Sequence, residues 1–261
     1  MPSTSIPSGD WRLPNVDDFL SPSTPFGELP WAVAAGAGGS KAAASAATQA
    51  LCKFNGAVAQ TVTTTVAGID AMELTGMVLN NANGVGVEAD ALMAIDTALP
   101  TAAQNAAFLF GIFDSSGAVS TGNFIGLLYG WNPVTNSNNN GFMICADTVA
   151  RLTGNTPTAQ AVQIPLNVVP ALDVANHIRF EVNQAWTLIR GMVNGVAAFP
   201  QIGTAAQLNI YPNILVPANG IPNITDGWLG MKLIGTTGTS QTMKVITDLV
   251  SYSLPGRVQY S

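Results

Sequence analysis

The sequence predicts an all-β fold, an antiparallel β-sandwich that follows an extended N-terminal arm. Apolar runs of roughly 5–10 residues, rich in Val, Ile, Thr and Phe, recur from Leu51 onward and are separated by Gly, Asn, Asp and Pro. Three such runs between Ile178 and Phe199 are joined by short turns, as in a meander. Residues 1–50 differ in composition, so we predict a boundary at residue 50 and a sandwich domain over residues 51–261.

Residues 1–50 are predicted to form an extended arm without a core of its own. Six prolines between positions 2 and 30 disfavour a regular helix or a central strand. Residues 32–50, AVAAGAGGSKAAASAATQA, fit either a short Ala-rich helix or a flexible linker. Because a purely disordered tail rarely keeps many large aromatic residues, we favour a docking arm over a disordered tail. The predicted anchors are Trp11, Phe19, Phe26 and Trp31.

The sandwich domain contains several short predicted strands. In residues 71–79, Met72, Leu74, Gly76 and Val78 alternate on one face. Further strands are expected at residues 108–113, 124–129, 141–146, 228–235 and 243–252. Ala-rich sequence between residues 90 and 107 predicts the one helical segment of the domain.

The meander occupies HIRFEVNQAWTLIRGMVNGVAAFP, residues 177–200. Its first strand is expected at residues 178–182, and Asn183-Gln184 forms the turn to a second strand at residues 186–193. Asn194-Gly195 suits a two-residue type I′ turn, which needs positive φ at both positions. Residues 196–199 then form the third strand.

This meander resembles the back of a concanavalin A-like or laminin-G-like jelly roll. In that family a strand of the Ile-Arg-Phe-Glu kind leads into one that ends in Val-Asn-Gly. A Pro-rich crossover and two last strands follow, which correspond here to Pro212, Pro217, Pro222 and residues 228–234 and 244–250. The resemblance covers residues 51–253 and is one of order and turns, so it implies a fold and leaves the function open. Such domains are found in virion proteins of tailed phages.

Charged residues make up 9% of the chain, against roughly 25% in an ordinary soluble domain. We interpret this as a surface buried against other subunits, which favours a homo-oligomer; a compositional bias of the host is the alternative. The resemblance to jelly-roll virion proteins, which often form trimers on the shell, implies a trimer. The net charge of −6 and the lack of a Lys/Arg cluster argue against a nucleic-acid partner. No stretch qualifies as a membrane span, and the N-terminus lacks the pattern of a secretory signal, so we expect synthesis and assembly in the cytosol.

No pattern of catalytic or metal-binding residues occurs in the sequence. Glu88 and Asp90 form the only close alternating acidic pair, and we interpret them as part of a solvated strand face rather than as glycosidase carboxylates. His177 is the only histidine and is expected at a strand edge. Cys52 and Cys145 are predicted to be small buried side chains, and their spacing leaves open whether they pair. We therefore predict a protein that is not an enzyme and has no catalytic residue, cofactor or metal.

The favoured functional hypothesis is a structural protein of a tailed-phage virion, namely a capsid decoration or cement protein. In this hypothesis the N-terminal arm docks on the major capsid protein or other virion subunits and stabilises the shell. An arm of about 30 extended residues would reach up to about 100 Å. A coat protein that encloses the genome is disfavoured, because acidic residues outnumber basic ones in the arm.

The alternative is a carbohydrate-binding module of a tail fibre or spike that recognises a host surface glycan. The candidate site is the polar segment of residues 131–141, expected as a loop. Trp131 would stack on a sugar ring, and amide side chains would bind its hydroxyl groups, although a solvated surface loop explains the same composition. The predicted amides are Asn136, Asn138, Asn139 and Asn140.

Overall fold

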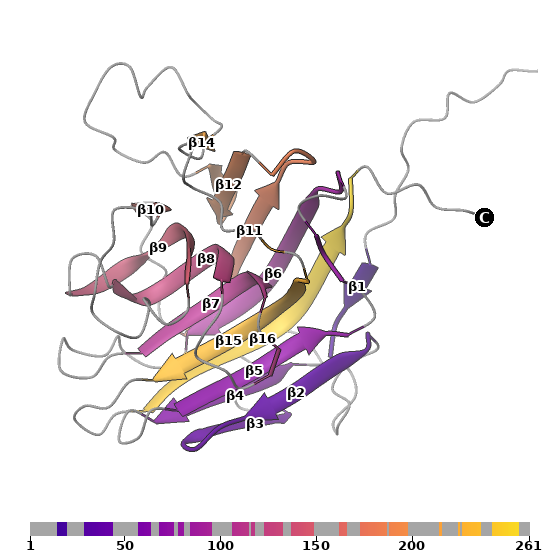
Figure 1. Ribbon diagram of the computed structural model, residues 1–261. Helices are drawn as coiled ribbons and strands as arrows, with labels where there is room; N and C mark the ends of the chain where they lie inside the picture. The colour runs from indigo at the N-terminus through magenta and orange to yellow at the C-terminus, as the bar shows by residue number, and fades with distance from the viewer. Residues whose placement is uncertain are drawn as a thin grey trace, which may run out of the picture.

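Two antiparallel sheets face each other in the computed structural model of the chain (Figure 1). Every element in the described part of the chain is a strand, which confirms the predicted all-β class. None of the described residues forms a helix long and apolar enough to cross a membrane. The described residues are 15–19, 29–43, 57–63, 68–75, 78–80, 84–95, 106–114, 116–117, 123–132, 137–148, 162–165, 173–186, 188–197, 214–215, 224, 226–235 and 242–255.

The larger sheet, here called sheet A, has nine strands in the order β13-β12-β11-β6-β16-β4-β3, with β1 also paired to β16 and β14 to β12. All its pairings are antiparallel. The strands are β1 (Asn15–Asp17), β3 (Gly39–Ala43), β4 (Val58–Thr63), β6 (Val87–Ile95), β11 (Asn176–Val182), β12 (Leu188–Val193), β13 (Val196–Ala197), β14 (Ile214–Leu215) and β16 (Thr242–Ser253).

The other sheet, sheet B, has seven strands in the order β10-β9-β8-β7-β15-β5-β2. The last two strands in the described part of the chain are therefore central, because β15 lies between β7 and β5, and β16 lies between β6 and β4. The strands of sheet B are β2 (Trp31–Ala35), β5 (Gly68–Leu74), β7 (Ala106–Phe113), β8 (Asn123–Asn132), β9 (Ser137–Thr148), β10 (Val162–Pro165) and β15 (Trp228–Gly235).

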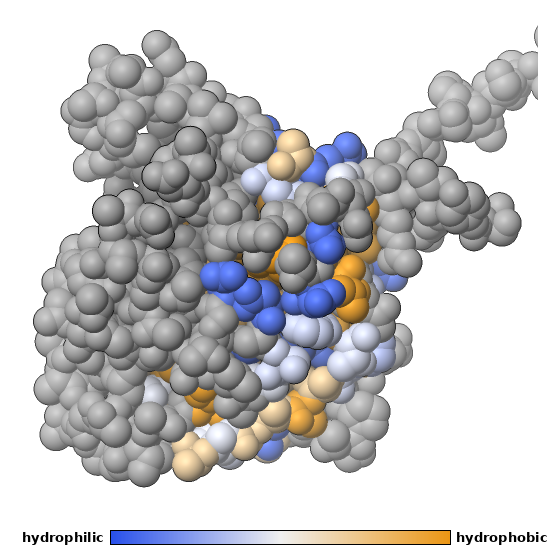
Figure 2. Space-filling view, viewed as in Figure 1, coloured by the Kyte–Doolittle hydropathy of each residue, from blue (hydrophilic) through white to orange (hydrophobic). Residues whose placement is uncertain are grey.

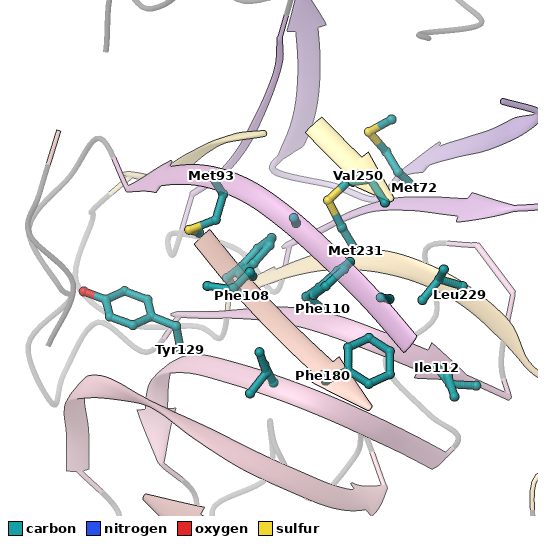
Figure 3. Packing of buried hydrophobic residues seen from close by; sticks show 14 of the residues in the cluster. Met72, Met93, Phe108, Phe110, Ile112, Tyr129, Phe180, Leu229, Met231 and Val250 are labelled. Atoms are coloured by element: carbon teal, nitrogen blue, oxygen red, sulfur yellow. The ribbon is translucent and has the colours of Figure 1, made fainter. Parts of the chain in front are cut away.

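The main core lies between the sheets, where alternate residues of each strand meet (Figure 3). Phe110 of β7 and Phe180 of β11 pack edge to face across the sandwich with ring centroids 5.3 Å apart. Fully burying one such side chain stabilises a fold by about 1.5–3 kcal/mol. β7 is buried on both faces, because a second apolar cluster with Leu109 and Phe113 covers its other side. Its unbroken apolar sequence, AAFLFGIF, fits this two-sided burial.

The predicted meander is confirmed as β11, β12 and β13. Asn194 and Gly195 have φ values of 54° and 74°, which is the geometry that a type I′ turn requires. One detail differs, because β12 begins at Leu188 and Trp186 lies before it with a φ of 53°. The buried Trp186 indole donates a hydrogen bond of 2.8 Å to the carbonyl of Val85, and this contact holds the residue in the turn.

Two local predictions are wrong. The described ends of the helix expected at residues 90–107 are strands instead, since β6 continues to Ile95 and β7 begins at Ala106, while residues 96–105 lie outside the described residues. In β6 the period of two, which buries alternate residues such as Met93, outweighs the weak helix propensity of Ala. The strand expected at residues 71–79 ends at Leu74, so Met72 lies in the core as predicted but Val78 is 54% exposed.

The described parts of residues 1–50 belong to the sandwich, which corrects the prediction of an arm without a core. β1 pairs with β16 of sheet A, β2 forms the outer edge of sheet B next to β5, and β3 forms the outer edge of sheet A next to β4. β2 and β3 are joined by a tight turn in which Gly38 has a φ of 77°. The low-complexity sequence of residues 32–43 therefore supplies one edge strand to each sheet, and the tight turn between them crosses from sheet B to sheet A (Figure 1).

Candidate functional site

Two of the four aromatic residues predicted to dock on a neighbour lie in the core of this chain. Phe19 is 2% exposed and Trp31 is 5% exposed, and their ring centroids are 5.6 Å apart. Neither ring is available to another subunit in this state, because both are packed inside the sandwich. Trp11 and Phe26 lie outside the described residues, so their docking role stays a prediction.

Asp17 holds these two rings in place, and the sequence reasoning did not single it out. Its buried carboxylate accepts hydrogen bonds from the amide of Phe19 at 2.9 Å, the amide of Leu29 at 2.8 Å and the indole of Trp31 at 2.7 Å. The contact joins the end of β1 to the start of β2. An Asp just before a turn, followed closely by an aromatic residue, was the available signal.

The described residues of the predicted glycan segment lie in the strands of the β8–β9 hairpin, with 131–132 at the end of β8 and 137–141 at the start of β9, rather than in a loop. Trp131 lies in β8 and is paired with Asn138 of β9, and Gly130 is paired with Asn139. The register shifts by two residues after the pair of Tyr129 and Phe142. Asn140 lies in β9 within that shift. Asn136 lies outside the described residues.

The base of this hairpin is anchored in the core. Tyr129 and Phe142 are buried with ring centroids 5.2 Å apart, and burial raises the pKa of Tyr129 to about 12. At Gly130, which has a φ of 112°, a Cβ atom would collide with the carbonyl oxygen of Ala106 on β7. Glycine is therefore needed at this position, and the hairpin tip rests on a rigid support.

Small residues surround the hairpin at this end of sheet B. Gly130 pairs with Ala107, and Ala106 pairs with Gly235, which in turn pairs with Gly68. The register thus brings the start of β7, the end of β15 and the start of β5 to the same end as the tip of β8–β9. Few large side chains from these strand ends compete with the hairpin for space.

The acidic pair that the sequence placed on a solvated strand face lies on the outer side of sheet A. Arg179 of β11 contacts Glu181 at 2.7 Å, Glu88 at 3.2 Å and Asp90 at 3.7 Å. His177 contacts Asp90 at 2.7 Å from an exposed position. Burial alone would lower the pKa of Arg179, but the three carboxylates outweigh it and raise the pKa. Glu88 and Asp90 are thus ion-paired on a sheet surface, where exposed pairs contribute about 0–1 kcal/mol each.

Sheet B carries a buried ion pair on its outer face. Lys232, which is 0% exposed, lies 2.9 Å from the carboxylate of Glu73 and 4.6 Å from the ring centroid of Phe113. Burial lowers the pKa of Lys232, and Glu73 opposes this shift. The second oxygen of Glu73 accepts a hydrogen bond from the amide of Gly117 at 2.7 Å. A lone Lys in the apolar run WLGMKLIG was the signal for such a pair, although the sequence did not indicate its partner.

A second buried ion pair connects the two sheets at the edge formed by β2 and β3. Lys41 of β3 lies 2.7 Å from Asp70 of β5 and also donates to the carbonyl of Ala34 at 3.0 Å. Burial raises the pKa of Asp70, and the neighbouring Lys41 opposes the shift. Both charges of this pair are enclosed by the fold, so its role is structural.

No group of three or more His, Cys, Asp or Glu residues within the described ranges is placed to hold a metal ion. Cys145 lies in β9, and Cys52 is outside the described residues, so their pairing stays open. In the view of Figure 2, hydrophilic and apolar residues of the described part alternate over short distances on the surface. No catalytic grouping emerges from the contacts of these residues.

No protein-family model matches the sequence, and neither does any curated protein. Solved structures do match its fold. A protein of unknown function, SO2946 from Shewanella oneidensis MR-1, is 11% identical with a TM-score of 0.60, over 94% of this chain and 88% of that one. Peanut lectin with a 9mer peptide is 10% identical with a TM-score of 0.55, over 94% and 99% of the two chains. Basic winged bean lectin with Tn-antigen is 12% identical with a TM-score of 0.50, over the same shares. At these identities the likeness concerns the fold alone, and the chain has a concanavalin A-like jelly-roll fold.

Proposed function

We propose that this protein is a non-enzymatic carbohydrate-binding module whose site is the tip of the β8–β9 hairpin. One observation carries the proposal, namely the strand register that makes Trp131 a cross-strand neighbour of Asn138, with Asn139 next to it. An indole offers a flat apolar face to a sugar ring, and amide groups both donate to and accept from sugar hydroxyls. The segment thus combines the two kinds of contact that a sugar needs.

The support beneath the hairpin favours a binding role. Tyr129 and Phe142 fix its base in the core, so the strand residues next to them lose little conformational freedom when a ligand binds. Lectins occur among the solved structures that share the fold, one of them with Tn-antigen. That likeness is an analogy of fold and adds only modest weight.

A glycan array with the wild-type protein and the variant Trp131→Ala tests the proposal. We expect the variant to lose at least about tenfold in affinity, because stacking on an aromatic ring contributes about 1–3 kcal/mol, by analogy with stacked bases. Trp228→Ala is the matched control, since it removes an indole from the opposite end of sheet B, where Trp228 pairs with Phe113. Circular dichroism confirms that both variants fold. Unchanged binding by Trp131→Ala, or no glycan signal at all, would contradict the proposal.

Capsid decoration in a tailed-phage virion is the second candidate, and the low charge of 9% favours it. The protein would be made in the host cytoplasm and bind the major capsid protein or other virion subunits as a homotrimer. Since Phe19 and Trp31 are buried, docking would rely on Trp11, Phe26 and the outer surface. Light scattering should then give three times the chain mass of 26.9 kDa. A monomer that does not co-sediment with assembled shells would count against this candidate.

A further inference from the structure

Two carboxylates meet where the N-terminal strand β1 joins β16. In this pairing Asp17 lies opposite Val250, so Asp18 continues alongside the segment that contains Asp248. β16 has an irregularity between Thr247 and Leu249, and Asp248 occupies it. Asp248 is 2% exposed, and Asp18 is half-buried. The two acidic residues therefore lie near each other, with Asp248 enclosed and Asp18 partly enclosed.

Each of the two carboxylates has a buried oxygen without a hydrogen-bond partner. In both Asp18 and Asp248 this oxygen is the Oδ1 atom. By contrast, the neighbouring Asp17 accepts three hydrogen bonds. Two like charges that lie close together in a buried site disfavour simultaneous ionisation, so such a pair retains a proton at pH values where a lone Asp is ionised.

The ionisable groups around Asp248 explain why its pKa is raised. β4 has no ionisable side chain, and β6 contributes Glu88 and Asp90, which both contact Arg179. Lys244 lies earlier on β16 itself. Burial, and then the charge of Asp18, raise the pKa of Asp248 to about 7 from an ordinary value of 3.8. No cation among the described residues contributes to this shift.

We propose that Asp18 and Asp248 share a proton that latches β1 onto β16, so that the N-terminal segment of residues 15–19 detaches more readily as the pH rises through neutrality. The sign follows from linkage: an acid whose pKa is raised in the closed state stabilises that state while protonated, and this stabilisation is lost as the pH rises toward the raised pKa. The strand pairing of β1 with β16 spans only three residues, so a modest change in free energy changes how often it opens. Detachment would also withdraw Phe19 from its contact with Trp31.

Hydrogen exchange of the intact protein, followed by mass spectrometry, tests the latch. Exchange of the peptide with residues 15–19 is compared at about pH 6 and about pH 8.5, after correction for intrinsic rates. With a closed-state pKa of about 7 and an open-state pKa of 3.8, linkage predicts that opening becomes about tenfold more frequent between these pH values. A peptide from the centre of β7, which has no ionisable residue, serves as the internal control and should not respond.

Two variants make the test specific. Asp248→Asn imitates the protonated side chain, so the protection of residues 15–19 should no longer depend on pH. Asp18→Asn removes the neighbouring charge, so the change should be clearly smaller than tenfold, and this variant keeps the test valid if Asp248→Asn fails to fold. Equal protection of the wild type at both pH values, or an unchanged tenfold response in Asp248→Asn, would overturn the latch. A third outcome would also overturn the latch. If millimolar CaCl2 or MgCl2 restores protection at about pH 8.5 in the wild type but not in Asp248→Asn, the pair is a cation site.

Discussion

The variant Asp17→Ala tests whether the N-terminal residues are held in the sandwich by the contacts seen in the structure. Alanine would leave three donors without their acceptor, namely the amides of Phe19 and Leu29 and the indole of Trp31. An unsatisfied buried donor costs about 1–3 kcal/mol. The amide of Leu29 is only partly buried, so water can replace the carboxylate there. We therefore expect the free energy of unfolding to fall by about 3–5 kcal/mol.

Urea unfolding followed by circular dichroism measures this loss. For a chain of this size, about 2–4 °C of melting temperature correspond to 1 kcal/mol, so the melting temperature should fall by roughly 10 °C. Asn15→Ala is the matched control in the same strand, because Asn15 is exposed, and it should change stability by less than about 0.5 kcal/mol. A loss of less than about 1 kcal/mol in Asp17→Ala would refute the reasoning. The N-terminal segment would then be undocked in solution, as expected of a free arm.

Two further substitutions test the register of sheet B and its buried charges. In Gly111→Ala, a Cβ atom would collide with the carbonyl oxygen of Ile125 and lie 2.8 Å from the Cα of Gly126. Because both are backbone atoms, we expect the free energy of unfolding, measured in urea, to fall by about 3 kcal/mol or more. A variant as stable as the wild type would show that β7 and β8 pair in another register. Lys232→Met would leave Glu73 buried without its counter-charge and should cost about 3–5 kcal/mol, whereas the double variant with Glu73→Gln should recover most of that loss. If Lys232→Met alone is as stable as the wild type, water must reach Glu73.

Local chemistry was enough to predict much of the sandwich. The Asn194-Gly195 turn follows from two residues that tolerate positive φ, and the alternation of Ile178, Phe180 and Val182 specifies which face of β11 is buried. The continuous apolar sequence of β7 is similarly local. These signals are short-range and agree with the final fold, so the elements they specify can be predicted without knowledge of distant strands.

The N-terminal strands and the buried charges depend on long-range contacts. β1 and β2 each begin directly after a proline, Pro14 and Pro30, and their small or isolated apolar residues carry no strong period of two. They become strands because β16 and β5 present free edges to them. The partner of Lys232 could not be predicted, since it is set by the pairing of β15 with β5. In the candidate glycan site, polar composition suggested a loop, but Asn138 and Asn139 extend β9 because each is paired with a residue of β8.

The central position of β15 and β16 delays folding of the sandwich until residues 228–253 have been made. A nascent chain exposes β4 to β11 to the ribosome surface long before residues 228–253 emerge, and each sheet then lacks the strand that joins its two halves. Such half-sheets leave apolar faces and unpaired strand edges open to other molecules. Productive folding is therefore dominated by contacts distant in sequence, which makes it slow and leaves the partly made domain in need of chaperones.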